Sequence, residues 1–600
     1  MLSAIREIGR WQINKDKKDE LDILIKEPFG MRGKVILIKV NIEKNAFEGI
    51  DLEEYDSVKI QRYLFRGGVS QGPNPTPVAN IPNVKQKRGE EGETYKKLES
   101  QIRKTFEGKI KKWFEKYGSE EKENFLGNIK KILSDNEDKI IKEIQTCIKD
   151  IDKKEGKLLT IKVKQDNEWK YIGDFDVFKE SLKRIEAQKA GSISASDKVC
   201  SVCGVRKESV SGDFGVFKFY TIDKPGFVIG GFNEKLAWKN FPVCLECKLE
   251  LEEGRKFIEN NLSFGFYGLR YLLIPKLILG DVNVNAEIIN ILSDSKKIVA
   301  LKERVKKRIT SDNNEILKIL GDEKDILTFN FLFLSREQSA ERILLLIEDI
   351  FPYRIKKIFE AKDYIDRIFN NDSDKGFTFG AIRTFFYKSS EGKRESDLNK
   401  YFLEIVDSVF KGRRLDFSFL LKFYMATIRK EFISDGYFMS KVVKDALMDT
   451  IFFEKLGIIT FEEVNMEESI FDTVFKKFEK SFGTPAKRGI FLLGVLTQLL
   501  LNKQWADRNA RPFMKYLKGL KLNEKDIKAI LPKVQNKLEE YGSFDKSKRL
   551  IASEASKCLL EAGEGWKMTT DEINFYFACG MNLVDDIRDI VYLKSNEKEE

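Results

Sequence analysis

Two Cys-x-x-Cys pairs, Cys200-Ser-Val-Cys203 and Cys244-Leu-Glu-Cys247, lie about forty residues apart near the middle of this 600-residue chain. Two residues between thiols allow both sulfur atoms of a turn to point at one ion, and two such pairs complete a tetrahedral zinc site. Gly204 permits a sharp turn beneath the metal, and a helical pattern at 248–260 follows the second pair. The spacing predicts structural zinc bound by Cys200, Cys203, Cys244 and Cys247. A redox dithiol, or unrelated buried thiols, are the alternatives.

A four-cysteine site leaves the metal no open position for an activated water, so we expect the zinc to stabilise the fold rather than to catalyse. The chain contains no histidine. This excludes Ser-His-Asp and Cys-His catalysis, histidine-dependent nuclease and phosphohydrolase sites, and mixed Cys/His zinc sites. We also find no Gly-x-x-x-x-Gly-Lys-Ser/Thr phosphate loop. These absences indicate a binding protein rather than an enzyme.

The composition, 42% hydrophobic and 34% charged, is typical of a globular protein with several cores. The seven cysteines are an odd number, as expected in a reducing compartment. The first turns carry charges and do not resemble a secretory signal, and the longest apolar run, 490–501, is too short to span a bilayer. We therefore expect a cytoplasmic protein with no membrane partner. The net charge of +10 permits nucleic-acid binding without requiring it.

The hydrophobic pattern predicts an α+β, multidomain fold. Strands are expected at 34–41, 57–65, 158–164 and 169–172, with paired strands at 214–222 and 226–230 between the cysteine pairs. Helical patterns cover 93–152, run one after another from 283 to 457, and return from 466 to 591. We therefore predict an N-terminal α+β domain at 1–280, with a zinc module inserted at about 195–260, a helical domain at 281–460, and a C-terminal helical bundle at 466–600.

A loop rich in glycine and proline, Tyr63-Leu-Phe-Arg-Gly-Gly-Val-Ser-Gln-Gly-Pro-Asn-Pro-Thr-Pro77, follows the second expected strand. Its glycines permit close approach of the backbone to a ligand, and its prolines restrict its conformations. One hypothesis is that the loop cradles a nucleic-acid backbone or enters a groove. The alternative is an ordinary proline-rich connector. The candidate contact residues in and around it are Arg62, Arg66, Gly67, Gly68, Asn74, Lys85, Lys87 and Arg88.

Basic clusters also occur along the helical middle of the chain. Each cluster alone is typical of a solvated helix end, and only alignment in three dimensions would make a track for phosphates. The clusters are Lys306-Lys-Arg308, Arg354 with Lys356 and Lys357, and Lys411 with Arg413 and Arg414 beside Phe417 and Phe419.

Taken in order, the loop at 63–77, the four cysteines and the C-terminal helical bundle resemble the large subunit of the type I-B CRISPR–Cas surveillance complex, Cascade. The resemblance implies a non-catalytic subunit that binds near the 5′ handle of the guide RNA, recognises the motif flanking the target, assists duplex opening and recruits a helicase-nuclease. The implied partners are guide RNA, double-stranded target DNA, guide-coating backbone subunits, a handle-binding subunit and small helical subunits.

Two other interpretations stay open. The large subunit of type III CRISPR complexes also combines a four-cysteine site with a helical bundle, but it needs a Gly-Gly-Asp-Asp turn, and here Asp585-Asp586 lacks the glycines. A zinc-stabilised interaction scaffold without nucleic acid is the second.

The resemblance also implies that the small helical subunit arises by internal translation of the same gene. Met466 is the candidate start, because Glu462-Glu463-Val464 can be encoded as GAG-GAG-GT, a ribosome-binding sequence.

Overall fold

The computed structural model describes residues 1–29, 32–67, 72–83, 91–118, 124–149, 151–152, 155–192, 194–212, 215–219, 233–277, 327–337, 340–369, 376–389, 396–434 and 439–596. The chain divides into two compact units. The N-terminal unit comprises Leu2–Asn260 and Gln338–Glu341, and the C-terminal unit comprises Met1, Asn261–Glu337 and Arg342–Glu600. In these ranges, no helix is long and apolar enough to cross a membrane.

The N-terminal unit is built on a five-stranded sheet in the order β2-β1-β4-β3, with β5 beside β4. β1 and β4 are parallel and form its centre. Both are nearly continuous apolar runs, as expected for strands covered on both faces, and Val35, Leu37, Leu159 and Ile161 are fully buried. The strands are β1 (Gly33–Asn41), β2 (Ala46–Glu54), β3 (Ala79–Asn80), β4 (Gly156–Gln165) and β5 (Glu168–Tyr171). The strands predicted at 34–41, 158–164 and 169–172 are confirmed.

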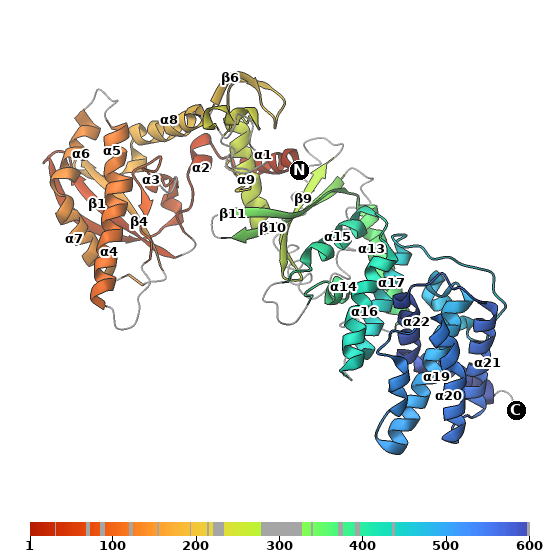
Figure 1. Cartoon of the computed structure of the whole chain (residues 1–600). Helices are drawn as coiled ribbons and strands as arrows, with labels where there is room; N and C mark the ends of the chain where they lie inside the picture. The colour runs from red at the N-terminus through yellow and green to blue at the C-terminus, as the bar shows by residue number, and fades with distance from the viewer. Residues whose placement is uncertain are drawn as a thin grey trace. The chain divides into compact units, whose positions relative to one another are not determined.

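Helices α6 and α7 pack on β1 and β2 (Figure 1). Trp113 of α5 is fully buried in the same core. The helices are α4 (Glu91–Thr105), a π-helical segment (Phe106–Lys111), α5 (Lys112–Tyr117), α6 (Asn124–Asp135) and α7 (Glu137–Lys149). The helical pattern predicted for 93–152 is confirmed for the described residues 93–117 and 124–149.

The strand predicted at 57–65 is wrong. The chain instead forms a 3-10 turn (Ser57–Lys59) and the short helix α3 (Ile60–Tyr63). Asp56 caps the turn, because its carboxylate accepts a hydrogen bond from the Val58 amide at 3.0 Å. A Cβ on Gly173 would lie 2.1 Å from the Gln61 carbonyl oxygen, so this helix packs directly against the backbone after β5.

The cysteine-bearing module follows α8 (Asp176–Ser192). It consists of the hairpin β6 (Ser194–Val199) and β7 (Arg206–Ser211), a 3-10 segment (Glu234–Lys239) and α9 (Leu245–Asn261). The predicted helix at 248–260 is confirmed. The predicted strand pair at 214–222 and 226–230 lies mostly outside the described residues, and the described part, 215–219, forms turns. Two further helices, α1 (Leu2–Asp16) and α2 (Glu20–Leu24), belong to this unit.

The C-terminal unit begins with a four-stranded sheet in the order β11-β10-β9-β8. Its strands are β8 (Ser263–Phe266), β9 (Leu269–Leu277), β10 (Leu327–Glu337) and β11 (Ala340–Ile350). The predicted run of helices is therefore wrong for 327–350. Phe329, Phe331 and Phe333 recur with the period of two that a strand requires, and all three are buried. The division between the units at Asn260 also differs from the predicted boundary at 280.

After β11 the described regular structure of this unit is helical, and the buried side chains of these helices form one hydrophobic core with the sheet, from Phe266 to Val591. The core crosses position 460, since α16 and α17 pack against α22. The long helix α19 contacts both α21 and α22 (Figure 1). The helices are α13 (Pro352–Ile368), α14 (Phe379–Phe385), α15 (Asn399–Lys411), α16 (Phe417–Ile433), α17 (Met439–Lys455), α18 (Asp472–Phe475), α19 (Pro485–Arg508), α20 (Glu524–Glu540), α21 (Lys546–Glu561), α22 (Thr570–Asn582) and α23 (Val584–Asn596), with 3-10 segments at Lys476–Phe482 and Pro512–Leu517. The predicted α+β class, with a β-containing N-terminal region and a helical C-terminal half, is confirmed.

Candidate metal centre and nucleic-acid surfaces

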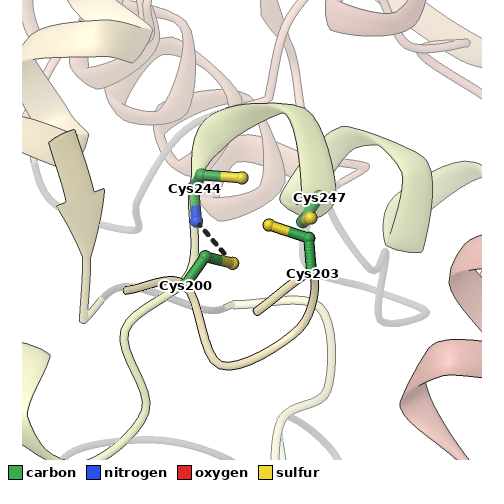
Figure 2. Close-up of side chains that lie close together, drawn as sticks. All are labelled: Cys200, Cys203, Cys244 and Cys247. Carbon is green, nitrogen blue, oxygen red and sulfur yellow. Dashed lines mark hydrogen bonds between the residues drawn. The ribbon is translucent and has the colours of Figure 1, made fainter. Parts of the chain in front are cut away.

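The four predicted cysteines come together in one cluster (Figure 2). Their Sγ atoms all lie within 4.8 Å of one another, and Cys200, Cys244 and Cys247 are buried. A tetrahedral zinc ion with Zn–S bonds of about 2.3 Å separates its sulfur ligands by about 3.8 Å, so the cluster fits such an ion. All seven cysteines are free of disulfides. The cluster is therefore a group that could hold a metal.

Backbone amides donate hydrogen bonds to one sulfur of the cluster, and such bonds favour a negatively charged thiolate. The first pair lies in the turn between β6 and β7, and the second lies at the start of α9. The amides of Val202 and Cys244 both donate to Cys200 Sγ at 3.4 Å. A hydrogen bond from the Cys247 thiol lowers the pKa of Cys244 to about 5, and that bond raises the pKa of Cys247. The thiolate form, which binds zinc, is thus favoured at Cys244, whereas burial raises the pKa of Cys200 despite its amide hydrogen bonds.

Helix α9 connects the cluster to the rest of the N-terminal unit through an acidic run that directly follows the second cysteine pair. Glu250 accepts hydrogen bonds from Arg6 Nε and Arg10 Nε of α1, each at 2.7 Å. Glu253 accepts one from Lys18 Nζ at 2.6 Å. These residues are not predicted from the sequence, although Glu250-Leu-Glu-Glu253 beside the cysteines carries the signal.

Two glycines let α9 and α1 touch backbone to backbone. A Cβ on Gly254 would lie 1.9 Å from the Ile5 carbonyl oxygen, and a Cβ on Gly9 would lie 1.7 Å from the Glu250 carbonyl oxygen. The helix that carries Cys247 in its first turn is therefore fixed against α1 at 250–254.

Two of the described residues predicted around the loop, Arg66 and Asn74, are buried. Arg66 is only 4% exposed and donates to Glu186 at 3.0 Å and to Glu252 at 3.2 Å. Burial alone would raise the pKa of Glu252, but Arg66, Lys26 and Lys248 outweigh burial and lower it. Asn74 is also buried and donates to the Val78 carbonyl oxygen at 2.6 Å. Neither Arg66 nor Asn74 is presented to a nucleic acid in this conformation.

The described part of the loop is a packed connector. Trp113 Nε1 donates to the Pro75 carbonyl oxygen at 2.9 Å, and Lys109 Nζ donates to that of Gly72 at 2.6 Å. Arg62 is partly exposed but pairs with Asp174 through two nitrogen atoms, each at 2.9 Å. Gly67 lies at the end of the described segment. Gly68, Lys85, Lys87 and Arg88 lie outside the described residues.

Two basic clusters that are far apart in sequence lie side by side in the C-terminal unit. Arg354 of α13 donates to the Val409 carbonyl oxygen at the end of α15, from Nε at 2.9 Å and from Nη2 at 2.6 Å. This bond places 354–357 beside 411–414, because a Cβ on Gly412 would lie 3.5 Å from Arg354 Cζ. The combined basic surface consists of the exposed residues Lys356, Lys357, Lys411, Arg413 and Arg414. The cluster Lys306-Lys-Arg308 lies outside the described residues.

Part of this surface has a structural role as well. Lys411 Nζ lies 2.8 Å from Asp407 Oδ1, and Arg413 pairs with the other oxygen of the same buried carboxylate. Lys356, Lys357 and Arg414 are the members whose replacement leaves Asp407 paired.

Comparison with known families gives the same order of parts. Three family models, described as the N-terminal, central and C-terminal domains of CRISPR-associated protein TM1802, match residues 1–184, 197–350 and 377–594. The chain belongs to the CRISPR-associated TM1802 family. The resemblance inferred from the sequence is thereby confirmed at the level of the family. A search of the curated proteins found no match.

The structure bears on one alternative within the CRISPR-associated proteins. Asp585 and Asp586 lie in the first turn of α23, and Asp585 pairs with Arg588 at 2.8 Å. The metal-binding Gly-Gly-Asp-Asp motif of the type III large subunit is a turn, whereas these two carboxylates start a helix. The pair therefore gives no support to a type III polymerase site.

Proposed function

We propose that this TM1802-family chain is the non-catalytic large subunit of a type I-B CRISPR RNA-guided DNA surveillance complex in antiviral defence. The observation that carries the proposal is the match of the three family models, in order, along the chain. The four-cysteine cluster and the combined basic surface support it. In such complexes base pairing reads the target, while protein reads only the short flanking motif.

In this role the chain binds near the 5′ handle of the guide, recognises the flanking motif and assists opening of the duplex. A helicase-nuclease recruited in trans cuts the DNA, so the large subunit needs no histidine or phosphate loop of its own. Backbone subunits, the handle-binding subunit and small helical subunits complete the assembly, which acts in the cytoplasm.

The metal in this proposal is zinc, held by Cys200, Cys203, Cys244 and Cys247. It joins the β6–β7 turn to the start of α9, and α9 in turn holds α1 through Glu250 and the Gly9–Gly254 crossing. Zinc binding free energy thereby becomes folding free energy of the N-terminal unit.

The combined basic surface is proposed to contact phosphates. Exposed lysine and arginine side chains attract a polyanion, and each contact releases counterions, so affinity falls with salt. Gly67 and the loop residues Gly68, Lys85, Lys87 and Arg88 stay candidates for contacts near the guide or the flanking DNA.

The experiment is reconstitution. The chain is co-expressed with a guide RNA and the other subunits of its own complex, and a tag on the chain is used for purification. We expect the complex to carry RNA, seen as excess absorbance at 260 nm, and to bind duplex DNA only beside certain flanking sequences. If a complex lacking this chain binds the same targets with the same flank preference, the proposal fails.

A variant pair tests the basic surface within that complex. Lys357→Ala with Arg414→Ala should weaken DNA binding and reduce the slope of log affinity against log salt by about 0.9 for each phosphate that the protein no longer neutralises. The matched control is Lys567→Ala, an exposed lysine elsewhere in the same unit. If the slope of log affinity against log salt is unchanged, the combined basic surface does not contact phosphates.

A further inference from the structure

Most of the net charge of the chain lies in one short stretch. Residues 503–549 contain thirteen lysines and arginines against six aspartates and glutamates, a net charge of +7 out of the +10 of the whole chain. The stretch covers the end of α19, the connection to α20, α20 itself and the start of α21. It does not include any residue of the combined basic surface described above.

The connection between α19 and α20 is rigid. Phe513, Leu517, Leu520 and Leu522 are buried beneath it. The Phe513 amide donates to Gln504 at 3.1 Å, and Asn574 of α22 both donates to and accepts from the Leu522 backbone, at 2.8 and 3.0 Å. These contacts fix the connection in one conformation.

Two large rings nevertheless remain at the surface. Trp505 is 47% exposed and Tyr516 is 38% exposed. Both are close to Phe513 along the chain and in space: Gln504, the sequence neighbour of Trp505, accepts from the Phe513 amide, and the Phe513 and Tyr516 ring centroids are 5.2 Å apart. A third ring, Tyr541, is partly exposed at the end of α20.

Cations lie over each of these rings. Arg511 Cζ is 5.1 Å from the centroid of Trp505, and Arg508 Cζ is 4.9 Å from that of Tyr541. Tyr516 has two, with Lys515 Nζ at 5.1 Å and Lys533 Nζ at 5.3 Å. The stretch therefore combines flat apolar rings with positive charge close to them.

The six carboxylates of the stretch pair with other cations. Asp507 pairs with Lys503 at 2.8 Å and Asp526 with Lys518 at 2.6 Å. The remaining pairs are Glu524 with Lys528, Glu539 with Arg549, Glu540 with Lys537 and Asp545 with Lys548. These six pairs do not include Arg508, Lys515 or Lys533. Of the seven cations outside these six pairs, four lie over the rings: Arg508, Arg511, Lys515 and Lys533.

We propose that this surface binds single-stranded nucleic acid, with bases stacked on Trp505 and Tyr516 and phosphates held by Arg508, Lys515 and Lys533. Base-tolerant single-strand sites are built from this combination of aromatic platforms and a basic groove. A duplex hides the faces of its bases, and an acidic protein segment would use the cations but not the rings. This proposal rests on the proposed function and adds a single-strand site to it, which is separate from the combined basic surface.

The test is fluorescence anisotropy of the full-length chain with a labelled oligothymidylate of twenty nucleotides. Trp505→Ala and Tyr516→Ala are each expected to weaken binding about 5- to 150-fold, the loss expected for one stacked base. Trp505→Phe and Tyr516→Phe should retain most of the affinity, because a ring remains. Tyr387→Ala, which removes a ring that is 45% exposed in the same unit, is the matched control and should bind as the native chain.

Salt titration separates stacking from charge. The two alanine variants should leave the salt slope unchanged, whereas Arg508→Ala with Lys515→Ala should lower it by about 0.7 for each phosphate that is no longer neutralised. Circular dichroism checks folding, which both rings affect little because they are about half exposed.

The proposal is overturned if the double variant Trp505→Ala/Tyr516→Ala binds the oligonucleotide as tightly as the native chain. It is also overturned if that variant loses affinity for the oligonucleotide and for a duplex of the same length by the same factor. Binding would then depend on charge and not on base stacking. The variant pair Lys357→Ala/Arg414→Ala should not change this binding, so failure of the proposed function and failure of this site give different results.

Discussion

Gly494 of α19 and Gly580 of α22 lie at the crossing of the two helices, where the backbones touch. A Cβ on Gly494 would be 2.2 Å from the Phe577 carbonyl oxygen, and a Cβ on Gly580 would be 1.9 Å from that of Phe491. Real Cβ atoms do not approach a backbone atom so closely, so neither position accepts a larger residue unless the helices separate. This crossing fixes the centre of the C-terminal bundle.

Gly580→Ala should therefore destabilise the C-terminal unit by about 3 kcal/mol, the upper end of the usual range for overpacking, because the obstacle is backbone. Thermal unfolding followed by circular dichroism measures the loss. The control is Gly127→Ala in α6, where a Cβ meets nothing within 4 Å. That change should stabilise its helix by about 1 kcal/mol. If Gly580→Ala and the native chain have the same melting temperature, the helices do not touch backbone to backbone at Gly580.

The metal centre predicts a second result. Cys247→Ser should reduce zinc from about one ion per chain to a trace, because a closed site needs all four ligands. It should also expose α1 to proteolysis, since α9 holds α1 through Glu250. Metal analysis and limited proteolysis are the measurements. Cys558→Ser, a buried cysteine of the C-terminal unit, is the control and should keep its zinc. A metal-free but fully protected native chain would disprove a structural zinc.

Arg66 provides a third prediction. Arg66→Ala would leave Glu186 and Glu252 buried without their cation, which typically costs about 3–5 kcal/mol. The N-terminal unit should unfold at lower denaturant. Arg62→Ala, which breaks an exposed pair with Asp174, should cost at most about 1 kcal/mol. If Arg66→Ala folds normally but loses guide RNA, Arg66 acts at the surface in the assembled complex.

The contrast between Arg66 and the cysteines shows what a sequence can predict here. Cysteine spacing is local, so four ligands and the helix after them could be placed from the pattern alone. The partners of Arg66 lie 120 and 186 residues away, and no local signal distinguishes a buried arginine from one that binds phosphate. The error at 57–65 came from a cap, Asp56, that outweighed strand propensity. The error at 327–350 came from overlooking the period of two in Phe329, Phe331 and Phe333.

A fourth prediction concerns pH. Glu454 of α17 is largely buried, and burial raises its pKa to about 7, despite the hydrogen bonds from the Lys480 and Ser481 amides. Glu479 also raises it, and Lys487 lowers it. The folded state therefore holds this proton more tightly than the unfolded chain does. The resulting stability is present below about pH 4.5 and is lost as pH rises through about 7.

Glu454→Gln should remove that dependence, so the variant should gain stability relative to the native chain at pH 8 and not at pH 5. Melting temperatures of the C-terminal unit at the two pH values give the answer. Glu468→Gln, an exposed glutamate, should change neither value. The prediction is wrong if the native chain melts at a higher temperature at pH 8 than at pH 5 and Glu454→Gln abolishes that difference. That result would mean that the ionised form of Glu454 stabilises the fold.

The last prediction concerns the small helical subunit that the proposed function requires. Met466 lies in a stretch without helix or strand between α17 and α18, and the helices after it, α19 to α23, pack on one another. A product starting there keeps the Gly494–Gly580 crossing but loses α16, whose Phe417 and Tyr424 rings lie against Phe575. We expect residues 466–600 to fold as a helical bundle that melts below the C-terminal unit of the full chain, because part of its core becomes exposed. Expression of the natural gene should give this product beside the full chain, and synonymous recoding of Glu462 to Val464 should remove it. A short product that persists after recoding, or a fragment that is unfolded by circular dichroism, would exclude Met466 as the start.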